Sequence, residues 1–479
     1  GRTARGPAML KRLAAPYVVG VASRVIGQAI AFATVAIASK FIDLDGFGTY
    51  AFGWALTVIA TTFVFTGFYQ ALLRSQNIER DRHTLFWAML GVGALGSIVI
   101  TGIGLTMGGL ATTEGRVILT LAPLPFVNVP AAWWEAQLVR AARVRAASLY
   151  VLIYESFALL TVIVLLSMGW GVFALVTSRV VAVAFGLLQT GLLVRRLPRF
   201  EFRLDALRAS RETAGPLWGT TSVALLSNYG ADLILGALAS PAVVGAYRGG
   251  ARIAMTAADL VMQPLGLLSW SKFTRIEKEG AGIPALRRAW IENMSLAAAL
   301  MWPMSMAVAL LAPLLVVTIL DDTWLPAASI VSILAVSKSI EFFANLLEPT
   351  MLTTGNAGRQ LKIRSAGAVT LIVALLAFGR FGPEAAAYCH LAASVVVGAA
   401  SLAATAKALE IPLRDMVMTF MPGAALAALT YVAVHWSSSL WGSVGSEVGL
   451  GLTLVKISVA WLILMAIFLR RRVLVLPTP

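Results

Sequence analysis

Six basic side chains lie inside long apolar stretches of this sequence. A lysine or arginine at the centre of a membrane helix costs about 2.5–3.5 kcal/mol on insertion scales, so such residues normally face a protein interior or a wet cavity. The planar guanidinium of arginine can hold several phosphate oxygens at once. The pattern therefore indicates that an anionic ligand is bound within a membrane. The six residues are Arg24, Arg179, Arg248, Arg252, Lys338 and Lys456.

Depth separates these cations into groups. Arg24 lies about eleven residues and Lys338 about thirteen residues into an apolar stretch, so both are predicted near mid-depth. We expect these two to bind the ligand, with a buried ion pair as the alternative for each. Arg179, Arg248 and Arg252 are further candidates. The last two lie four residues apart on one helix face, where bracing of the helix is an equal alternative. The sixth cation, Lys456, is predicted to extend its side chain to the membrane surface.

Carboxylates inside the same stretches could neutralise the cations or couple transport to an ion. Glu341 lies three residues from Lys338 on one helix face and could pair with it. Asp232, with Asn228 one turn earlier, is the main candidate for coupling to a proton or another cation, because a buried carboxylate can titrate near neutral pH. Glu155 is a second candidate. A salt bridge from Asp232 to a cation on another helix is an equal alternative.

The residue types that other chemistries require are absent or scattered. The three histidines (His83, His390 and His435) lie far apart, and Cys389 is the only cysteine. The sequence contains no phosphate-binding glycine loop, no metal-ligand spacing and no nucleophile–histidine arrangement. We therefore expect no catalytic residues, no metal and no cofactor.

Composition places the chain in a membrane. Its 479 residues are 59% apolar and 13% charged, with a mean hydropathy of +0.83, whereas soluble proteins carry roughly 25% charged residues. At roughly 20 apolar residues per span, the chain accommodates about fourteen transmembrane helices. The gaps between them are too short for a folded soluble domain, which argues against an extramembrane enzyme. We predict an all-α polytopic membrane protein.

Most of the 38 lysines and arginines lie in every second gap between the apolar stretches. This alternation is the positive-inside pattern, so the net charge of +15 reflects membrane orientation rather than nucleic-acid binding. A missed or extra helix would invert every later gap. The unbroken alternation therefore predicts an even number of spans and places both termini in the cytoplasm.

The longest cytoplasmic gap, about residues 195–213, divides the chain into similar halves. Phe47-Gly48-Thr49-Tyr50 opens the second predicted span, and Val244-Gly245-Ala246-Tyr247 opens the eighth, 197 residues later. Six spans separate the two copies, so the halves are predicted to be parallel repeats. The predicted organisation is a basic tail (1–12), two six-helix lobes (13–212 and 213–411), and two extra helices with a second basic tail (412–479).

Short motifs over most of the chain resemble the polysaccharide transporter family. This family, the flippases for lipid-linked oligosaccharides, belongs to the multidrug/oligosaccharidyl-lipid/polysaccharide exporter superfamily. The motifs are Asp45 to Tyr50 with Gln70 to Arg74, Gly169 to Val176, Pro241 to Tyr247 with Arg252, and Thr323 to Ala328.

The resemblance implies two six-helix lobes around a central cavity that opens alternately to each side of a bacterial cytoplasmic membrane. The implied cargo is an oligosaccharide repeat unit on an undecaprenyl-pyrophosphate type of carrier, moved from the inner to the outer leaflet for surface polysaccharide assembly. An ion gradient or the membrane potential would drive it. Membrane lipid, a polysaccharide polymerase and glycosyltransferases are the implied partners. Related flippases use cavity arginines on the first and eighth helices, where Arg24 and either Arg248 or Arg252 lie.

Two other functions compete with this interpretation. A drug/cation antiporter of the same superfamily should have a net acidic cavity, whereas cations here at least match the acids at mid-depth. An integral-membrane glycosyltransferase could use Asp43-Leu44-Asp45 in the first outer loop. Such enzymes need sizeable outer loops to hold substrate, and the outer gaps here are short.

Overall fold

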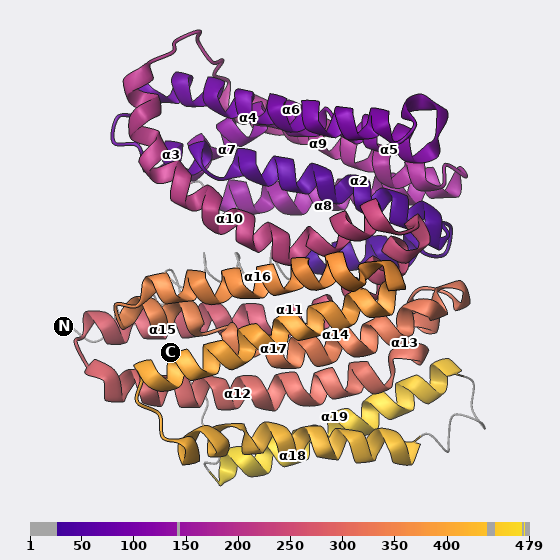
Figure 1. The fold of residues 1–479 in the computed structure, drawn as a ribbon, viewed down its shortest axis with the longest axis vertical. Helices are drawn as coiled ribbons and strands as arrows, with labels where there is room; N and C mark the ends of the chain where they lie inside the picture. Colours follow the sequence, from indigo (N-terminus) through magenta and orange to yellow (C-terminus); the bar gives the residue numbers. More distant parts are fainter. Residues whose placement is uncertain (1–25, 141–143, 438–445, 472–473, 475–479) are drawn as a thin grey trace, which may run out of the picture. The chain divides into compact units, whose positions relative to one another are not determined.

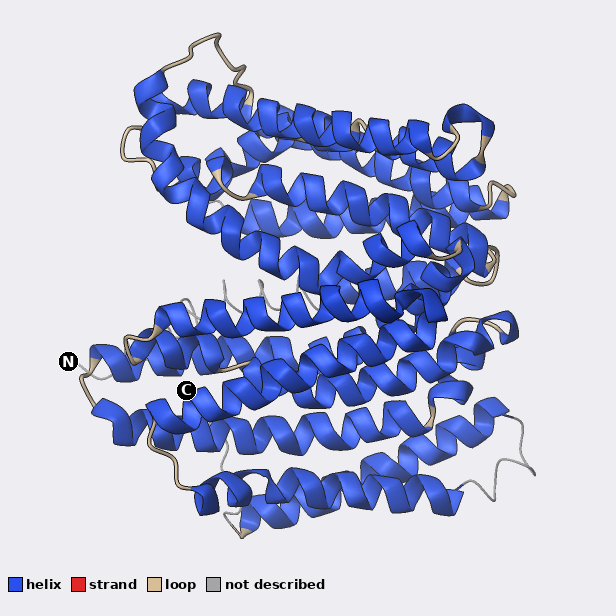
Figure 2. Cartoon of the chain, viewed as in Figure 1, coloured by secondary structure: helices blue, strands red, loops and turns tan. Residues whose placement is uncertain are grey.

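A computed structural model describes residues 26–140, 144–437, 446–471 and 474. These residues form helices joined by short loops, with no strand among them (Figure 2). The predicted all-α membrane class is therefore confirmed. Twelve of the described helices are long and apolar enough to cross a membrane. Two shorter apolar helices, Ile26–Ala38 and Ile153–Ser167, lie within the first and fifth predicted spans, and the total of fourteen spans stays a prediction.

The helices form two compact units, of which the first comprises the described residues up to Gly236 together with Ser240–Gly245 (Figure 1). Its helices are α2 (Leu44–Phe65), α3 (Phe68–Arg74), α4 (Ile78–Thr106), η1 (Gly109–Ala111), α5 (Thr113–Leu121), α6 (Leu124–Val127), α7 (Val129–Arg140), α8 (Val144–Ser167), α9 (Val172–Val194) and most of α10 (Leu204–Leu238). This unit extends one helix beyond the predicted lobe boundary at 212–213. Helix α10 belongs to it because Trp218 packs on Phe68 of α3 and Gly236 lies against Phe52 of α2. The predicted lobe boundaries themselves stay predictions.

The second unit comprises Ala237–Ala239 and the described residues from Ala246 onward. Its helices are α11 (Pro241–Lys278, whose first turn belongs to the first unit), α12 (Gly282–Leu310), α13 (Ala312–Ile319), η2 (Asp322–Ala327), α14 (Ala328–Glu341), η3 (Phe342–Ala344), α15 (Leu347–Thr353), α16 (Ala357–Phe378), η4 (Gly379–Phe381), α17 (Pro383–Ala408), α18 (Leu413–Ser437) and α19 (Ser446–Arg470). The trailing pair α18 and α19 packs on α12. Gly423 lies directly against Ala298, and the Trp461 indole donates a hydrogen bond of 3.1 Å to the carbonyl of Ala299.

The second predicted span is broken at Gly67, between α2 and α3. Gly67 has a φ of 52°, and Trp218 fills the space that a side chain there would need. The break leaves the carbonyl of Phe63 without its helical partner, and the Trp218 indole donates to it at 3.1 Å. Non-helical backbone at membrane depth is tolerated where the protein itself satisfies the freed polar groups. Trp218 thus both shapes the break and stabilises it.

The first turns of α2 and α11 cross at two glycines. A Cβ atom on Gly48 would collide with the carbonyl oxygen of Pro241, and one on Gly245 would collide with that of Leu44. Both partners of each contact have counterparts 197 residues away in the other contact, so the two contacts are reciprocal. Reciprocal contacts between equivalent residues define a local two-fold relation between these helix turns. Only glycine permits so close an approach of two helix backbones.

Two aspartates cap the crossing helices. Asp43 accepts a hydrogen bond of 2.9 Å from the backbone N–H of Gly46 at the start of α2. Asp45 accepts one of 3.1 Å from the backbone N–H of Ala242 at the start of α11. Carboxylates at these positions satisfy free N–H groups and complement the helix dipole. Asp43 and Asp45 therefore serve the fold, which weakens the glycosyltransferase interpretation that assigned them a catalytic role.

Replacing Gly48 by alanine should destabilise the protein by about 1–3 kcal/mol, because the new methyl group must push two helix backbones apart. The matched control is Gly91→Ala in α4, since a Cβ there has nothing within 4 Å. Alanine should be neutral or stabilise α4 by up to about 1 kcal/mol. Thermal unfolding of both variants in detergent tests this. Equal melting temperatures for the two would contradict the crossing described above.

Candidate functional site

The strongest candidate site lies in the second unit, around Lys338 of α14. The Lys338 ammonium contacts Oε2 of Glu341 at 2.5 Å, and their side chains are 16% and 32% exposed. The pairing that the i, i+3 spacing suggested is confirmed. Both residues lie near the end of α14, where the tenth predicted span changes from α-helix to the 3-10 helix η3. The pair is therefore largely enclosed by protein.

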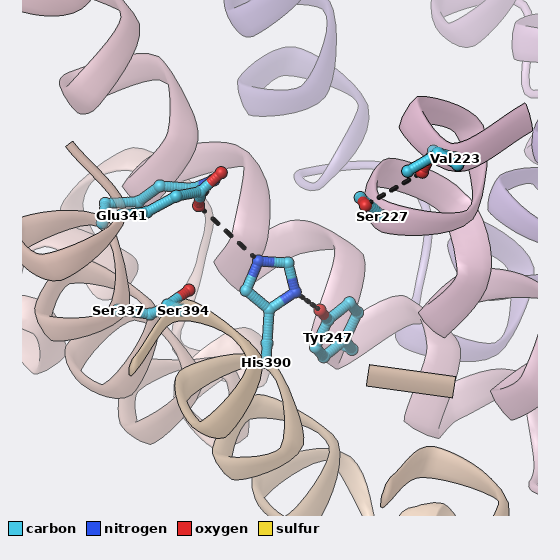
Figure 3. A network of polar contacts seen from close by, with 8 residues as sticks. Val223, Ser227, Tyr247, Ser337, Glu341, His390 and Ser394 are labelled. Atoms are coloured by element: carbon cyan, nitrogen blue, oxygen red, sulfur yellow. Dashed lines mark hydrogen bonds and ion pairs between the residues drawn. The ribbon is translucent and has the colours of Figure 1, made fainter. Parts of the chain in front are cut away.

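His390 of α17 extends this pair into a network (Figure 3). Its Nε2 lies 4.0 Å from the same Oε2 of Glu341, and its Nδ1 lies 3.4 Å from the Tyr247 hydroxyl of α11. The His390 side chain is only 9% exposed. A hydrogen bond of 2.7 Å between the buried hydroxyls of Ser337 and Ser394 holds α14 against α17 one turn away. Three helices thus fix the imidazole between a carboxylate and a hydroxyl.

Further charges surround this network. Asp259 of α11 interacts electrostatically with Lys338 and with Arg252, and its side chain is hydrogen bonded to Gln263. Arg364 of α16 acts on Glu341 in the same way. The group therefore holds three permanent cations against two carboxylates, so its net charge is positive. Two of the predicted ligands, Lys338 and Arg252, belong to this group.

A second cluster lies in the first unit, around Arg179 of α9. Its Nε donates to the Tyr50 hydroxyl at 3.2 Å, and its Nη1 lies 3.3 Å from Oε2 of Glu155. The guanidinium also lies 4.7 Å from the ring centre of Trp54, a cation–π distance. The structure thus joins a predicted cargo ligand, Arg179, to a predicted coupling residue, Glu155. This arrangement braces α2, α8 and α9 against one another.

The two clusters occupy equivalent positions in the repeat. Tyr50 and Tyr247 end the repeated motifs that open α2 and α11. Each tyrosine contacts the eighth residue of a later helix, Arg179 in α9 and His390 in α17. The same position therefore carries a permanent cation in the first unit and a titratable imidazole in the second.

For Asp232, Asn228 and Arg248 the structure gives the position in the helix and the burial of the side chain. Asp232 is fully buried in α10, whereas Asn228 one turn earlier is exposed, so the two side chains have different surroundings. Arg248 is half-buried on α11, one turn before Arg252. Arg24 lies outside the described residues. The roles predicted for these residues stay predictions.

Sequence reasoning missed His390, Tyr247 and Trp54. A lone histidine in an apolar span gives no spacing signal. The relation of His390 to Arg179 appears only in the structure, where each is the eighth residue of its helix, α17 and α9. Among the described residues, no group of three or more His, Cys, Asp or Glu side chains is placed to hold a metal ion.

A family model described as polysaccharide biosynthesis protein matches residues 37–329. This match confirms the resemblance predicted from the short motifs. Comparison with curated protein sequences gives no match.

The fold is similar to several solved transporter structures. The lipid II flippase MurJ, in an inward closed conformation, matches with a TM-score of 0.75 and 12% identity over 96% of this chain and 99% of that one. An inward-facing multidrug resistance MATE family transporter of the MOP superfamily matches with a TM-score of 0.64 and 11% identity over 83% and 98%. A mutant of the Vibrio cholerae MATE transporter VcmN gives 0.52 and 16% over 85% and 99%. At these identities the likeness establishes a shared fold and no shared ligand.

Glutamine substitutions at Arg179 and Glu155 should reveal a coupled pair. Each single change should lower the melting temperature, because it leaves a largely buried charge without its partner. The double variant should lose less than the sum of the two, with a coupling energy of about 0.5–3 kcal/mol. Combining Arg179→Gln with Glu114→Gln is the control, and there the losses should add. Additive losses in the Arg179–Glu155 pair itself would show that the contact contributes nothing.

Proposed function

The chain belongs to the polysaccharide biosynthesis protein family, and from this premise we propose that it is a flippase for a polyprenyl-pyrophosphate-linked oligosaccharide. The cargo headgroup enters from the cytoplasmic leaflet and leaves toward the outer leaflet by alternating access, while the lipid tail stays in the bilayer. The carrier is of the undecaprenyl-pyrophosphate type. The protein lies in a bacterial cytoplasmic membrane with both termini in the cytoplasm. Glycosyltransferases supply its cargo and a polysaccharide polymerase consumes it.

The observation that carries this proposal is the positive net charge of the group around Lys338. A pyrophosphate headgroup brings negative charge to membrane depth, where an uncompensated charge is expensive. Excess cations compensate that charge, whereas a cationic drug would need excess carboxylates. The shared fold of flippases and antiporters does not decide between them, but the sign of the charge around Lys338 favours an anionic cargo.

Lys338 and Arg252 are the proposed headgroup ligands in the described part of the chain, with Arg24 and Arg248 as further ligands. Arg179 is the least available of the predicted set, because its donors already serve Tyr50 and Glu155. The membrane potential, negative inside, favours outward movement of negative charge by about 2.3 kcal/mol per charge per 100 mV. Coupling through Asp232, Asn228 or Glu155 would add an ion gradient to this driving force.

Lys338→Ala should slow cargo flipping by about tenfold or more, since a charge-assisted contact to phosphate contributes about 1.5–3 kcal/mol. The measurement uses proteoliposomes that contain a fluorescent polyprenyl-pyrophosphate oligosaccharide and follows its accessibility to an external quencher. The matched control is Lys456→Ala, since this lysine is exposed on α19. That variant should flip cargo at the wild-type rate.

Equal rates for Lys338→Ala and wild type would remove Lys338 from the headgroup site. A wild-type protein that leaves the lipid unmoved and instead exchanges a cationic dye against an ion gradient would overturn the flippase assignment in favour of the antiporter.

A further inference from the structure

In the Lys338–Glu341 pair, the proposed headgroup ligand already contacts an anion. Oε2 of Glu341 lies 2.5 Å from the Lys338 ammonium. A phosphate oxygen of the cargo would make the same kind of contact. When no cargo phosphate is bound, the enclosed ammonium needs another anion as its partner, because a lone buried ammonium is costly. When cargo takes the ammonium, however, the carboxylate of Glu341 loses its closest cation. Something else must then compensate this carboxylate.

His390 is the group placed to do so. Its Nε2 faces the same carboxylate oxygen that Lys338 contacts, at 4.0 Å. Tyr247 at Nδ1 suits either protonation state, because a hydroxyl can donate to neutral imidazole or accept from imidazolium without moving. A proton added to the imidazole therefore finds both ring N–H groups already opposite acceptors. The equivalent position in the first unit, Arg179, carries a permanent positive charge, so the fold accommodates a cation at this place.

The other charged groups around His390 are not placed to compensate the Glu341 carboxylate in its stead. Helix α14 presents Lys338 and Glu341, and Arg364 of α16 acts on Glu341 while it donates to the carbonyl of Ala344 at 3.2 Å. On α11, Arg252 and Asp259 act on each other. In the elements η4 and α15, which also pack on α17, the charged residues Arg380 and Glu348 are exposed.

We propose that His390 and Glu341 form a proton-binding site whose occupancy is coupled to the binding of a phosphate-type anion at Lys338. This inference rests on the proposed function, since it takes Lys338 to be the headgroup ligand. Anion binding withdraws Lys338 from Glu341, and the His390–Glu341 pair takes up one proton from solvent. Release of the anion returns Lys338 to Glu341, and the proton leaves. Because coupling is reciprocal, protonation of the pair also strengthens anion binding.

Isothermal titration of inorganic pyrophosphate into the purified full-length protein tests this, using two buffers of different ionisation enthalpy at neutral pH. The heat difference between buffers counts the protons taken up, and the contribution of pyrophosphate itself is the same for every variant. Wild type should take up about one more proton per bound pyrophosphate than His390→Gln or Glu341→Gln, as linkage requires. Glu341→Gln should also bind pyrophosphate severalfold more tightly, because it no longer competes for Lys338. His435→Gln, at an exposed histidine on α18, should behave as wild type.

The outcomes separate the two proposals. Pyrophosphate binding with the same proton uptake in wild type and both variants contradicts the proton site and leaves the anion site standing. No pyrophosphate binding by wild type contradicts the anion site, and with it the proposed function of Lys338. If His390→Gln fails to fold, Glu341→Gln alone still decides, since it should lose the proton while it retains the anion.

Discussion

A charge or a polar backbone group inside a membrane must find its partner within the protein, and the described features of this chain follow from that constraint. The helix break at Gly67 frees the carbonyl of Phe63, and Trp218 supplies the missing donor. Arg179 meets a carboxylate, a hydroxyl and an aromatic ring at once. Lys338 meets Glu341. A charged cargo could bind inside such a protein only by displacing one member of a charge pair that is already formed.

The internal repeat concentrates where that constraint is tightest. Gly48 and Gly245 allow two helix turns to touch backbone to backbone, so their lack of a side chain is required. Two residues after each glycine, Tyr50 and Tyr247 hold the polar residue of a later helix in place. The short repeated motif therefore provides a helix crossing and a hydrogen-bonding position.

The sequence predicted the features that depend on local spacing. The Lys338–Glu341 contact follows from three residues on one helix turn, and the class of the fold follows from the length of the apolar stretches. The contacts between helices could not be predicted from the sequence. Arg179 and Glu155 were both singled out, but with opposite roles, because nothing in the sequence shows how α8 rotates against α9. The orientation of α17 toward α14 is what turns His390 from an isolated histidine into part of a charged network.

The choice of lysine at position 338 matters for exchange. An arginine such as Arg179 distributes several donors among several partners, so withdrawing it would leave more than one group unsatisfied. The ammonium of Lys338 is a compact charge that can pass from one oxygen to another by a small movement of a flexible stem. The carboxylate it leaves, Glu341, then faces His390 at 4.0 Å. In the proposed mechanism, Arg179 of the first unit stays in a fixed brace, whereas Lys338 of the second unit changes partners. Such an exchangeable cation suits a site in which Glu341 and a cargo phosphate compete for one ammonium.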